Sequence, residues 1–261
     1  MTSPTERFTG LVQLDEADIP LDEAALLIAA HAYPGLDVSS ELSRLDGLAA
    51  VCPSPTLDAL RHHLFDDFGL AGNTRRYADP RNSFLNDVLT RRRGIPISLS
   101  VVTIEVGRRL GLMLVGIGMP GHFLVRDEAG GRLVDPFDGG RLLGFDDVAR
   151  LYRSQHGARA PFGPALLAPV GPRAILVRML ANLRQLYLAA GNARAAGWVY
   201  ELRAAIPAGT PADSADVARS LASIGRFTEA ANTLDALAET VPDAGAAEAR
   251  ARAVSLRALL N

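Results

Sequence analysis

Apolar residues recur at helical spacing through most of the first 95 positions. The segments 21–34, 39–52, 54–70 and 82–94 each carry this pattern, and each ends beside a proline or a glycine. The segment 54–70 opens with Ser54 and Pro55, which is typical of a helix start. A further helix is expected at 97–112, where most neighbouring positions are also small or apolar. The pattern therefore predicts helices broken by loops, followed by one helix that is buried on most of its sides.

The pattern then changes to three short apolar runs that are rich in branched residues. They are LMLVGIG (112–118), HFLVR (122–126) and RLVDPF (132–137), and glycine or proline bounds each of them. Such runs predict strands. The segment 142–157 returns to helical spacing, whereas 157–172 carries four prolines and is expected to be a linker or an extended segment. The chain is therefore expected to be mainly helical α+β.

From Arg173 onward the spacing is helical, and a repeat is visible. LAAGNARAA (188–196) and LASIGRFTEAA (221–231) align with Gly191 on Gly225, a separation of 34 residues. This is the tetratricopeptide period, which predicts stacked helix pairs. Such pairs usually expose a groove for a protein or peptide partner, and here they could instead only support the first domain. Two domains are expected, at 1–165 and 173–261.

Composition narrows the classes of function. The 261 residues carry a net charge of −2 and are 48% hydrophobic, so the chain is expected to be globular, with no global attraction for nucleic acid. The start lacks a signal pattern and no apolar run is long enough to span a membrane, so a cytoplasmic location is expected. Cys52 is the only cysteine, which excludes an internal disulfide and a cysteine-based zinc site. No metal or cofactor is expected.

The candidate chemistry lies at His122 and Asp135, on the second and third expected strands. Side chains alternate between the faces of a strand. A two-residue loop at 128–129 would place His122 directly opposite Asp135, and a four-residue loop over 128–131 would place Asp135 opposite Leu124. Both loops bring the imidazole and the carboxylate within contact reach on one face. A three-residue loop would separate them, so the contact is a prediction that the structure can refute.

A carboxylate that binds one imidazole nitrogen fixes the tautomer of the ring. This arrangement is the second half of a nucleophilic triad, whose first half would be a cysteine or serine at the start of a buried helix. The helix that precedes these strands begins within GIPISLS, and Ser98 is its nearest hydroxyl. Serine at such a position is also typical of a helix cap or of a hydroxyl that bonds to backbone.

Three runs carry a resemblance that covers almost the whole chain. DPRNSFLNDVLTRRRGIPISLSVVTIEVGRRLGL (79–112), GIGMPGHFLVR (116–126) and LVDPFDGGRLL (133–143) follow one another in order. Together they resemble the SirB-type branch of the transglutaminase-like superfamily. The resemblance implies a transglutaminase-like (papain-like) core of helices and an antiparallel sheet, followed by an all-α tetratricopeptide-like region. It also implies that His122 and Asp135 match the histidine and aspartate of the superfamily's Cys–His–Asp triad, and that the cysteine position falls near Pro96.

Two functions stay open from the sequence. The first is a non-catalytic protein that has kept the His122–Asp135 pair, has lost the cysteine, and binds a protein or peptide partner through its repeats. In this case the pair is a structural hydrogen bond or a remnant that contacts a ligand. The alternative is a hydrolase or acyltransferase with a Ser98–His122–Asp135 triad. Asn82 and Asn86, four residues apart, are expected on one helical face. Asn82 could cap the helix that begins there, and Asn86 is expected to hydrogen-bond to loop backbone near the hairpin. Alternatively, both contact a ligand together with Pro96.

Overall fold

The structure, a computed structural model, describes residues 2–260, and their contacts group them into two compact units. Asp15–Asn182 form the first, which we call the core unit. Met1–Leu14 and Leu183–Asn261 form the second, which we call the helical unit. This grouping places residues 1–14 with the C-terminal helices and residues 173–182 with the core unit, whereas the sequence suggested domains at 1–165 and 173–261.

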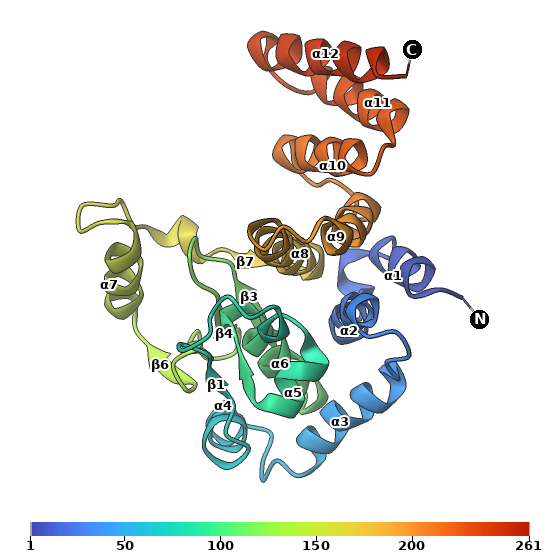
Figure 1. Ribbon diagram of the computed structural model, residues 1–261. Helices are drawn as coiled ribbons and strands as arrows, with labels where there is room; N and C mark the ends of the chain where they lie inside the picture. Colours follow the sequence, from blue (N-terminus) through green and yellow to red (C-terminus); the bar gives the residue numbers. More distant parts are fainter. Residues whose placement is uncertain (1, 261) are drawn as a thin grey trace. The chain divides into compact units, whose positions relative to one another are not determined.

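The core unit is built around α6 (Pro96–Arg109), whose residues from Pro96 to Gly107 are all buried. This agrees with the expectation of a helix surrounded on most sides. α6 packs against α2, α3, α4 and α5, and against strands β3 and β4 (Figure 1). The helices of this unit are η1 (Glu16–Asp18), α2 (Leu21–Ala32), α3 (Val38–Ala50), α4 (Leu57–Arg61), the π-helical η2 (His62–Asp67), η3 (Pro80–Asn82), α5 (Leu85–Arg91), α6, α7 (Phe145–His156), η4 (Pro164–Leu167) and the first part of α8 (Pro172–Ala189).

An antiparallel sheet covers one side of α6. Its strands run in the order β6-β5-β4-β3-β7, and every neighbouring pair is antiparallel. A separate short parallel pair joins β1 to β2. The strands are β1 (Ala71–Gly72), β2 (Arg93–Gly94), β3 (Leu114–Ile117), β4 (Leu124–Asp127), β5 (Leu133–Asp135), β6 (Arg141–Leu143) and β7 (Pro169–Val170).

The sheet has two strands that the sequence analysis did not predict. The segment 157–172 was expected to be a linker or an extended segment, and within it Pro169 and Val170 pair with Ile117 and Gly116 at the sheet edge. Proline is tolerated there because an edge strand does not need every backbone N–H for a ladder. The start of the helix expected at 142–157 is wrong, since Leu142 belongs to β6 and α7 begins at Phe145.

Two helices expected near the N-terminus are interrupted. The segment 54–70 begins its helix at Leu57, capped by Thr56 rather than Ser54, and changes to a π-helix at His62. In the segment 82–94 the α-helix is limited to α5, because Phe84 is extended and Arg92 adopts a left-handed φ of 56° that stops the helix, after which Arg93 and Gly94 form β2. Local capping and backbone conformation therefore shortened elements whose apolar spacing was correctly recognised.

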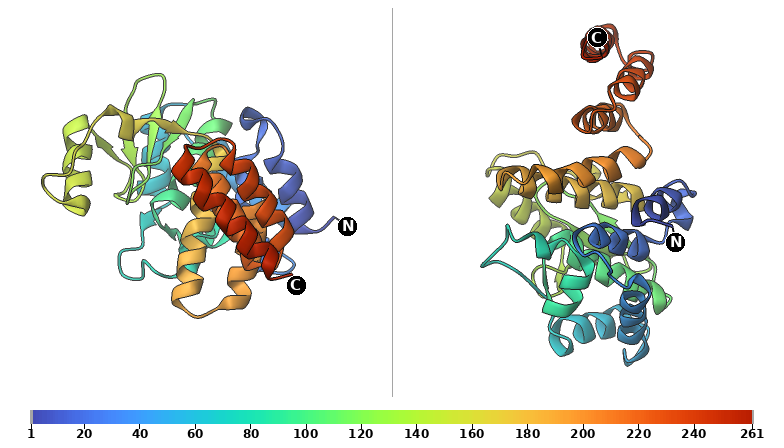
Figure 2. Two further views of the ribbon diagram at one scale, coloured as in Figure 1. Left: turned by 90° about the horizontal axis from the view of Figure 1, so that it is seen from above. Right: turned by 45° about the vertical axis from the view of Figure 1, so that its right-hand side comes forward.

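The helical unit contains α1 (Pro4–Val12), the end of α8, α9 (Ala193–Ala205), α10 (Pro211–Ser223), α11 (Phe227–Ala238) and α12 (Asp243–Ala258). The helices from α9 to α12, orange to red in Figure 2, pack in sequence against one another. The turns at Gly191 and Gly225 are alike: both glycines have positive φ, and Asn192 and Arg226 each donate to a carbonyl five residues earlier. Glycine adopts this conformation without the penalty that a Cβ brings.

None of the helices formed by residues 2–260 combines the length and apolar character that a bilayer crossing requires. Within the same residues, no three His, Cys, Asp or Glu side chains gather in an arrangement that could hold a metal ion.

Candidate functional site

His122 and Asp135 are hydrogen-bonded in the core unit. Nε2 of His122 lies 2.9 Å from Oδ2 of Asp135, and the two residues are only 6% and 4% exposed. The contact that the hairpin pattern predicted is therefore confirmed. The strand pairs Val125–Val134 and Arg126–Leu133 fix the register, and continuing it places Asp135 opposite Leu124. This is the register of the four-residue loop over 128–131, in which His122 and Asp135 are diagonal neighbours.

Turns rather than strands carry the imidazole. β4 begins at Leu124, so His122 precedes the strand that was expected to contain it. The backbone N–H of His122 donates to the carbonyl of Met119 at 3.1 Å, and Gly121 between them has a φ of 76°. A residue with a Cβ would be strained at this positive φ, so the turn at Pro120–Gly121 requires the glycine.

Asp135 is held by backbone amides. Its Oδ1 accepts hydrogen bonds from the N–H groups of Phe137 at 3.0 Å and Asp138 at 3.3 Å. These bonds fix the carboxylate and leave Oδ2 to accept the proton of Nε2, which assigns the tautomer of His122 from the hydrogen-bond network. In the described part of the chain, Nδ1 of His122 has no hydrogen-bond partner. The pair therefore presents an oriented imidazole with one unused nitrogen.

Two aromatic rings extend the site outward from His122. Phe137 packs edge-on against the imidazole at a centroid distance of 6.1 Å, and Tyr77 packs edge-on against Phe137 at 5.9 Å. Tyr77 is 51% exposed. It comes from the polar loop between β1 and η3, far from His122 in the sequence. These contacts place an exposed phenol beside the histidine through one intervening ring.

Arg178 of α8 completes this cluster. Its Nη2 donates to the backbone carbonyl of His122 at 2.8 Å, and its guanidinium carbon lies 5.3 Å from the centre of the Phe123 ring. Within residues 2–260, Arg178 forms no ion pair with a carboxylate. Burial lowers the pKa of Arg178, while burial raises the pKa of Tyr77 against the opposing charge of Arg178. Arg178 is thus a partly buried cation that no carboxylate of residues 2–260 pairs with.

Ser98 does not join the pair. It is the third residue of α6 and is fully buried, and its hydroxyl donates to the carbonyl of Asn82 at 2.5 Å. The same oxygen accepts the N–H of Ile95 at 3.1 Å. None of its hydrogen bonds reaches His122. Ser98 therefore serves the helix start, as a serine near a helix N-terminus often does.

Pro96 is the first residue of α6 and is buried. Proline is favoured at this position because its missing N–H would have no helical partner. Cys52 follows α3, where its thiol contacts the carbonyl of Ser54 at 3.4 Å. The geometry brings together His122 and Asp135, and it gives Pro96 and Ser98 roles in the helix start.

Asn82 is the centre of a buried polar network. Its Nδ2 donates to the carbonyls of Arg76 at 2.7 Å and Tyr77 at 3.2 Å, and its Oδ1 accepts from Asn73 at 2.9 Å. Asn82 thereby holds the loop that carries Tyr77. Since its carbonyl also accepts from Ser98, Asn82 connects this loop to the start of α6.

Asn86 does not share a helix with Asn82, because η3 ends at Asn82 and α5 begins at Leu85. The expectation that Asn86 bonds to loop backbone is wrong. Its Oδ1 is buried without a hydrogen-bond partner in the described structure.

One cavity borders a candidate residue, and another lies in the helical unit. In the core unit, Asp135 borders a polar cavity of about 320 Å³ whose charged groups include Arg141, Asp147 and Arg150. Its charges are internally paired, since Arg150 lies 2.5 Å and Arg141 lies 3.7 Å from Asp147. This cavity therefore offers little unsatisfied charge to a ligand.

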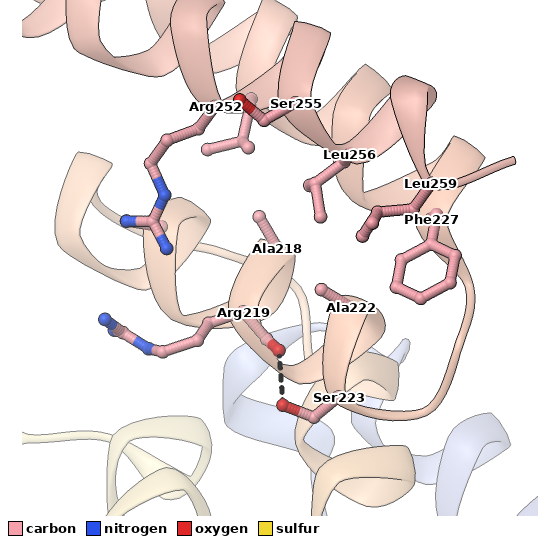
Figure 3. A pocket seen from close by; sticks show the side chains of 11 residues that line it. Ala218, Arg219, Ala222, Ser223, Phe227, Arg252, Ser255, Leu256 and Leu259 are labelled. Carbon is pink, nitrogen blue, oxygen red and sulfur yellow. Dashed lines mark hydrogen bonds between the residues drawn. The ribbon is translucent and has the colours of Figure 1, made fainter. Parts of the chain in front are cut away.

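The second cavity is a groove of about 360 Å³ between α10, α11 and α12 in the helical unit. Figure 3 shows Arg219 and Arg252 extending along one side of it and Phe227 and Leu259 on the other. Its remaining lining is small or apolar apart from Ser223 and Ser255, and no acidic residue contributes to it. We call this surface the repeat groove.

Sequence reasoning did not identify Tyr77, Phe137 or Arg178. Phe137 was visible as part of the DPF run, and Tyr77 as an aromatic residue in a polar loop, a combination that points to a functional surface. Arg178 lies 56 residues beyond His122 in an otherwise ordinary helix, so only the tertiary contact reveals it.

Comparisons with known proteins give matches to one superfamily profile and to several relatives. A sequence profile described as the transglutaminase-like superfamily matches residues 30–181. A UPF0162 protein of Xylella fastidiosa (strain Temecula1) is 40% identical over 194 residues, which cover 69% of each chain. A UPF0162 protein of Pseudomonas aeruginosa is 36% identical over 185 residues, or 67% of this chain and 68% of that protein. F-box only protein 21 of Mus musculus is 35% identical over 143 residues, which cover 51% of this chain and 22% of that protein. No solved structure gave a significant match.

Proposed function

This chain belongs to the transglutaminase-like superfamily, and we propose that it is a non-catalytic, SirB-type member that acts by binding a protein or peptide partner. In this proposal the His122–Asp135 pair is retained, the nucleophilic cysteine is replaced near Pro96, and the tetratricopeptide-like helices bind the partner in the repeat groove.

The observation that carries the proposal is that the Ser98 hydroxyl is buried and bonded to backbone rather than to His122. Covalent catalysis needs a nucleophile within hydrogen-bond reach of its base. The Ser98 hydroxyl is fully buried and makes its hydrogen bonds with the backbone of Asn82 and Ile95. Cys52 is engaged in a loop after α3. Neither residue therefore favours the alternative of a hydrolase or acyltransferase that uses Ser98, His122 and Asp135.

The composition of the repeat groove supports a specific kind of partner. Its floor of Ala218, Ala222 and Leu256 would accept an apolar side chain, while Arg219 and Arg252 would attract a carboxylate. Arg252 has no ion-pair partner in the described chain, and Arg219 shares Asp216 with Arg184 and Arg203. We therefore expect the partner to present an acidic residue beside an apolar anchor.

Two measurements test the proposal. A fluorophosphonate probe, together with a thiol-directed probe, should label wild type and Ser98→Ala to the same low extent. In a peptide-array screen of the full chain, acidic-apolar peptides should bind wild type but not an Arg219→Glu/Arg252→Glu variant. A variant with Arg194→Glu, which changes an exposed arginine outside the groove, is the matched control. Labelling that depends on Ser98, or peptide binding that survives both groove charge reversals, would refute the proposal.

A further inference from the structure

The core unit contains a second arrangement that the repeat groove does not explain. Arg178, Tyr77 and His122 come from α8, from the loop before η3, and from the turn before β4, and their contacts bring them to one place. Each of them carries a polar group that the protein leaves unused or only partly used.

Arg178 supplies an incompletely satisfied cation. Of its donors, Nη2 bonds to the carbonyl of His122, and no other hydrogen bond of this guanidinium is made within residues 2–260. A guanidinium forms two parallel hydrogen bonds with a carboxylate, which a partly buried arginine without an acidic partner is free to do. One guanidinium neutralises one negative charge, so this group suits a carboxylate better than a phosphate dianion.

His122 supplies an acceptor beside that cation. Because Asp135 binds Nε2, the remaining lone pair is on Nδ1, and the side chain is nine-tenths buried with this atom unpartnered. Nδ1 is not among the fully enclosed unpartnered atoms of the described residues, so a ligand can reach it. Arg178 binds the backbone carbonyl of the same histidine, so the guanidinium and the imidazole are both positioned at His122.

A peptide chain end matches this pair of groups, because its last residue carries a carboxylate and an amide N–H a few ångströms apart. We propose that the core unit binds the C-terminal end of a peptide, with the terminal carboxylate on Arg178 and the terminal amide N–H on Nδ1 of His122. Tyr77, whose ring is held by Phe137 and whose loop is held by Asn82, donates its hydroxyl at the outer side of the same site.

The inference is independent of the repeat groove, because no groove residue takes part in it. The test uses the full chain labelled with ¹⁵N, and it follows the imidazole nitrogens of His122 in long-range ¹H–¹⁵N spectra. The probe is N-acetyl-alanyl-alanine with a free carboxylate. Its C-terminal carboxamide, acetate and inorganic phosphate are the comparison compounds. The two comparison anions separate chain-end recognition from general anion binding.

We expect the free acid to shift the Nδ1 resonance of His122 in a saturable manner, and the carboxamide and acetate to produce much weaker shifts. Arg178→Met should weaken binding roughly tenfold or more, because hydrogen bonds to charged groups are among the stronger ones. Arg178→Lys retains the charge and can still bond to the His122 carbonyl but lacks the planar fork, so it should weaken binding several-fold. Arg159→Met, which removes an exposed arginine of the same unit, should leave binding unchanged.

Several results would overturn the inference. They are equal shifts with acid and carboxamide, tighter binding of phosphate than of the peptide, the absence of a saturable shift up to about 20 mM probe, and equal affinity of wild type and Arg178→Lys. Should Arg178→Met fail to fold, as a thermal melt would show, the Arg178→Lys comparison still decides the matter.

Discussion

Asp135 accepts a hydrogen bond from Nε2 of His122 at 2.9 Å although the two residues are not opposite each other in the hairpin. The four-residue turn over 128–131 offsets them diagonally, and the turn at Pro120–Gly121 directs the imidazole back to the carboxylate. Because both side chains are buried, the pair contributes to the stability of the core unit whatever else it does.

Replacing His122 by alanine should therefore destabilise the protein. Oδ2 of the buried Asp135 would lose its donor while Oδ1 keeps the two backbone N–H groups, and such a loss typically costs about 1–3 kcal/mol. The free energy of unfolding, measured by urea denaturation, checks this. Asp138→Asn, an exposed neighbour in the same turn, should change it little. A loss for His122→Ala as small as that of the control would mean that the pair is a solvent-open dyad with no structural role.

A second buried pair predicts a pH dependence. Glu105 of α6 and Asp22 of α2 are 3% and 2% exposed, and Arg108 and Arg109 bind both carboxylates, with Asp46 on the far side of Arg109. Burial, followed by the charge of Asp22, raises the pKa of Glu105 from 4.5 to about 7. Between these two pH values the folded state holds a proton that the unfolded chain has released.

The stability contributed by this proton is complete below pH 4.5 and is lost as the pH rises to about 7. A shift of this size corresponds to a loss on the order of 3 kcal/mol. Glu105→Gln, which cannot ionise, should gain stability relative to wild type between pH 5 and pH 8 in urea denaturation. Glu248→Gln, at an exposed position, should show the same pH dependence of stability as wild type. A difference between wild type and Glu105→Gln that is constant over this range would contradict the raised pKa.

Asn82→Ala should both destabilise the chain and release the loop of Tyr77. The substitution leaves the carbonyls of Arg76 and Tyr77 without their shared donor and removes the acceptor of Asn73. We expect a loss of about 3 kcal/mol in the free energy of unfolding. Hydrogen exchange at residues 73–79 should also become faster than in wild type, and this increase should be larger than any increase in α6. Unchanged protection of this loop would show that other contacts position Tyr77.

In the helical unit, Arg203 joins α9 to α10. It is 2% exposed, and its guanidinium bonds to Asp216 at 2.9 Å and to Asp213 at 3.3 Å. Arg203→Met should cost about 3 kcal/mol, because Asp213, Asp216 and the carbonyl of Ile206 lose a buried donor, although Arg184 and Arg219 still contact Asp216. Arg219→Met is the matched control. It removes an exposed partner of the same Asp216, and exposed pairs contribute about 0–1 kcal/mol. Similar losses for the two variants in chemical denaturation would argue against a buried role for Arg203.

Much of the fold was accessible from the sequence because it depends on local periodicity. Helical spacing located α2, α3, α6 and the C-terminal helices, and branched runs located β3, β4 and β5. Element ends were less accessible. Thr56 caps α4 in place of Ser54, and the left-handed Arg92 ends α5, since both depend on backbone conformation rather than on apolar spacing.

The sequence by itself determined that His122 and Asp135 would share a face if their loop had an even number of residues, and that a buried helix would begin within GIPISLS (94–100). Only the tertiary structure decided which loop was formed, that Ser98 bonds to Asn82 rather than to His122, and that Arg178 and Tyr77 join the histidine. The physical reason is the distance along the sequence over which each kind of interaction acts. Periodicity and capping act between residues a few positions apart, whereas these contacts join distant segments through packing that no local pattern encodes.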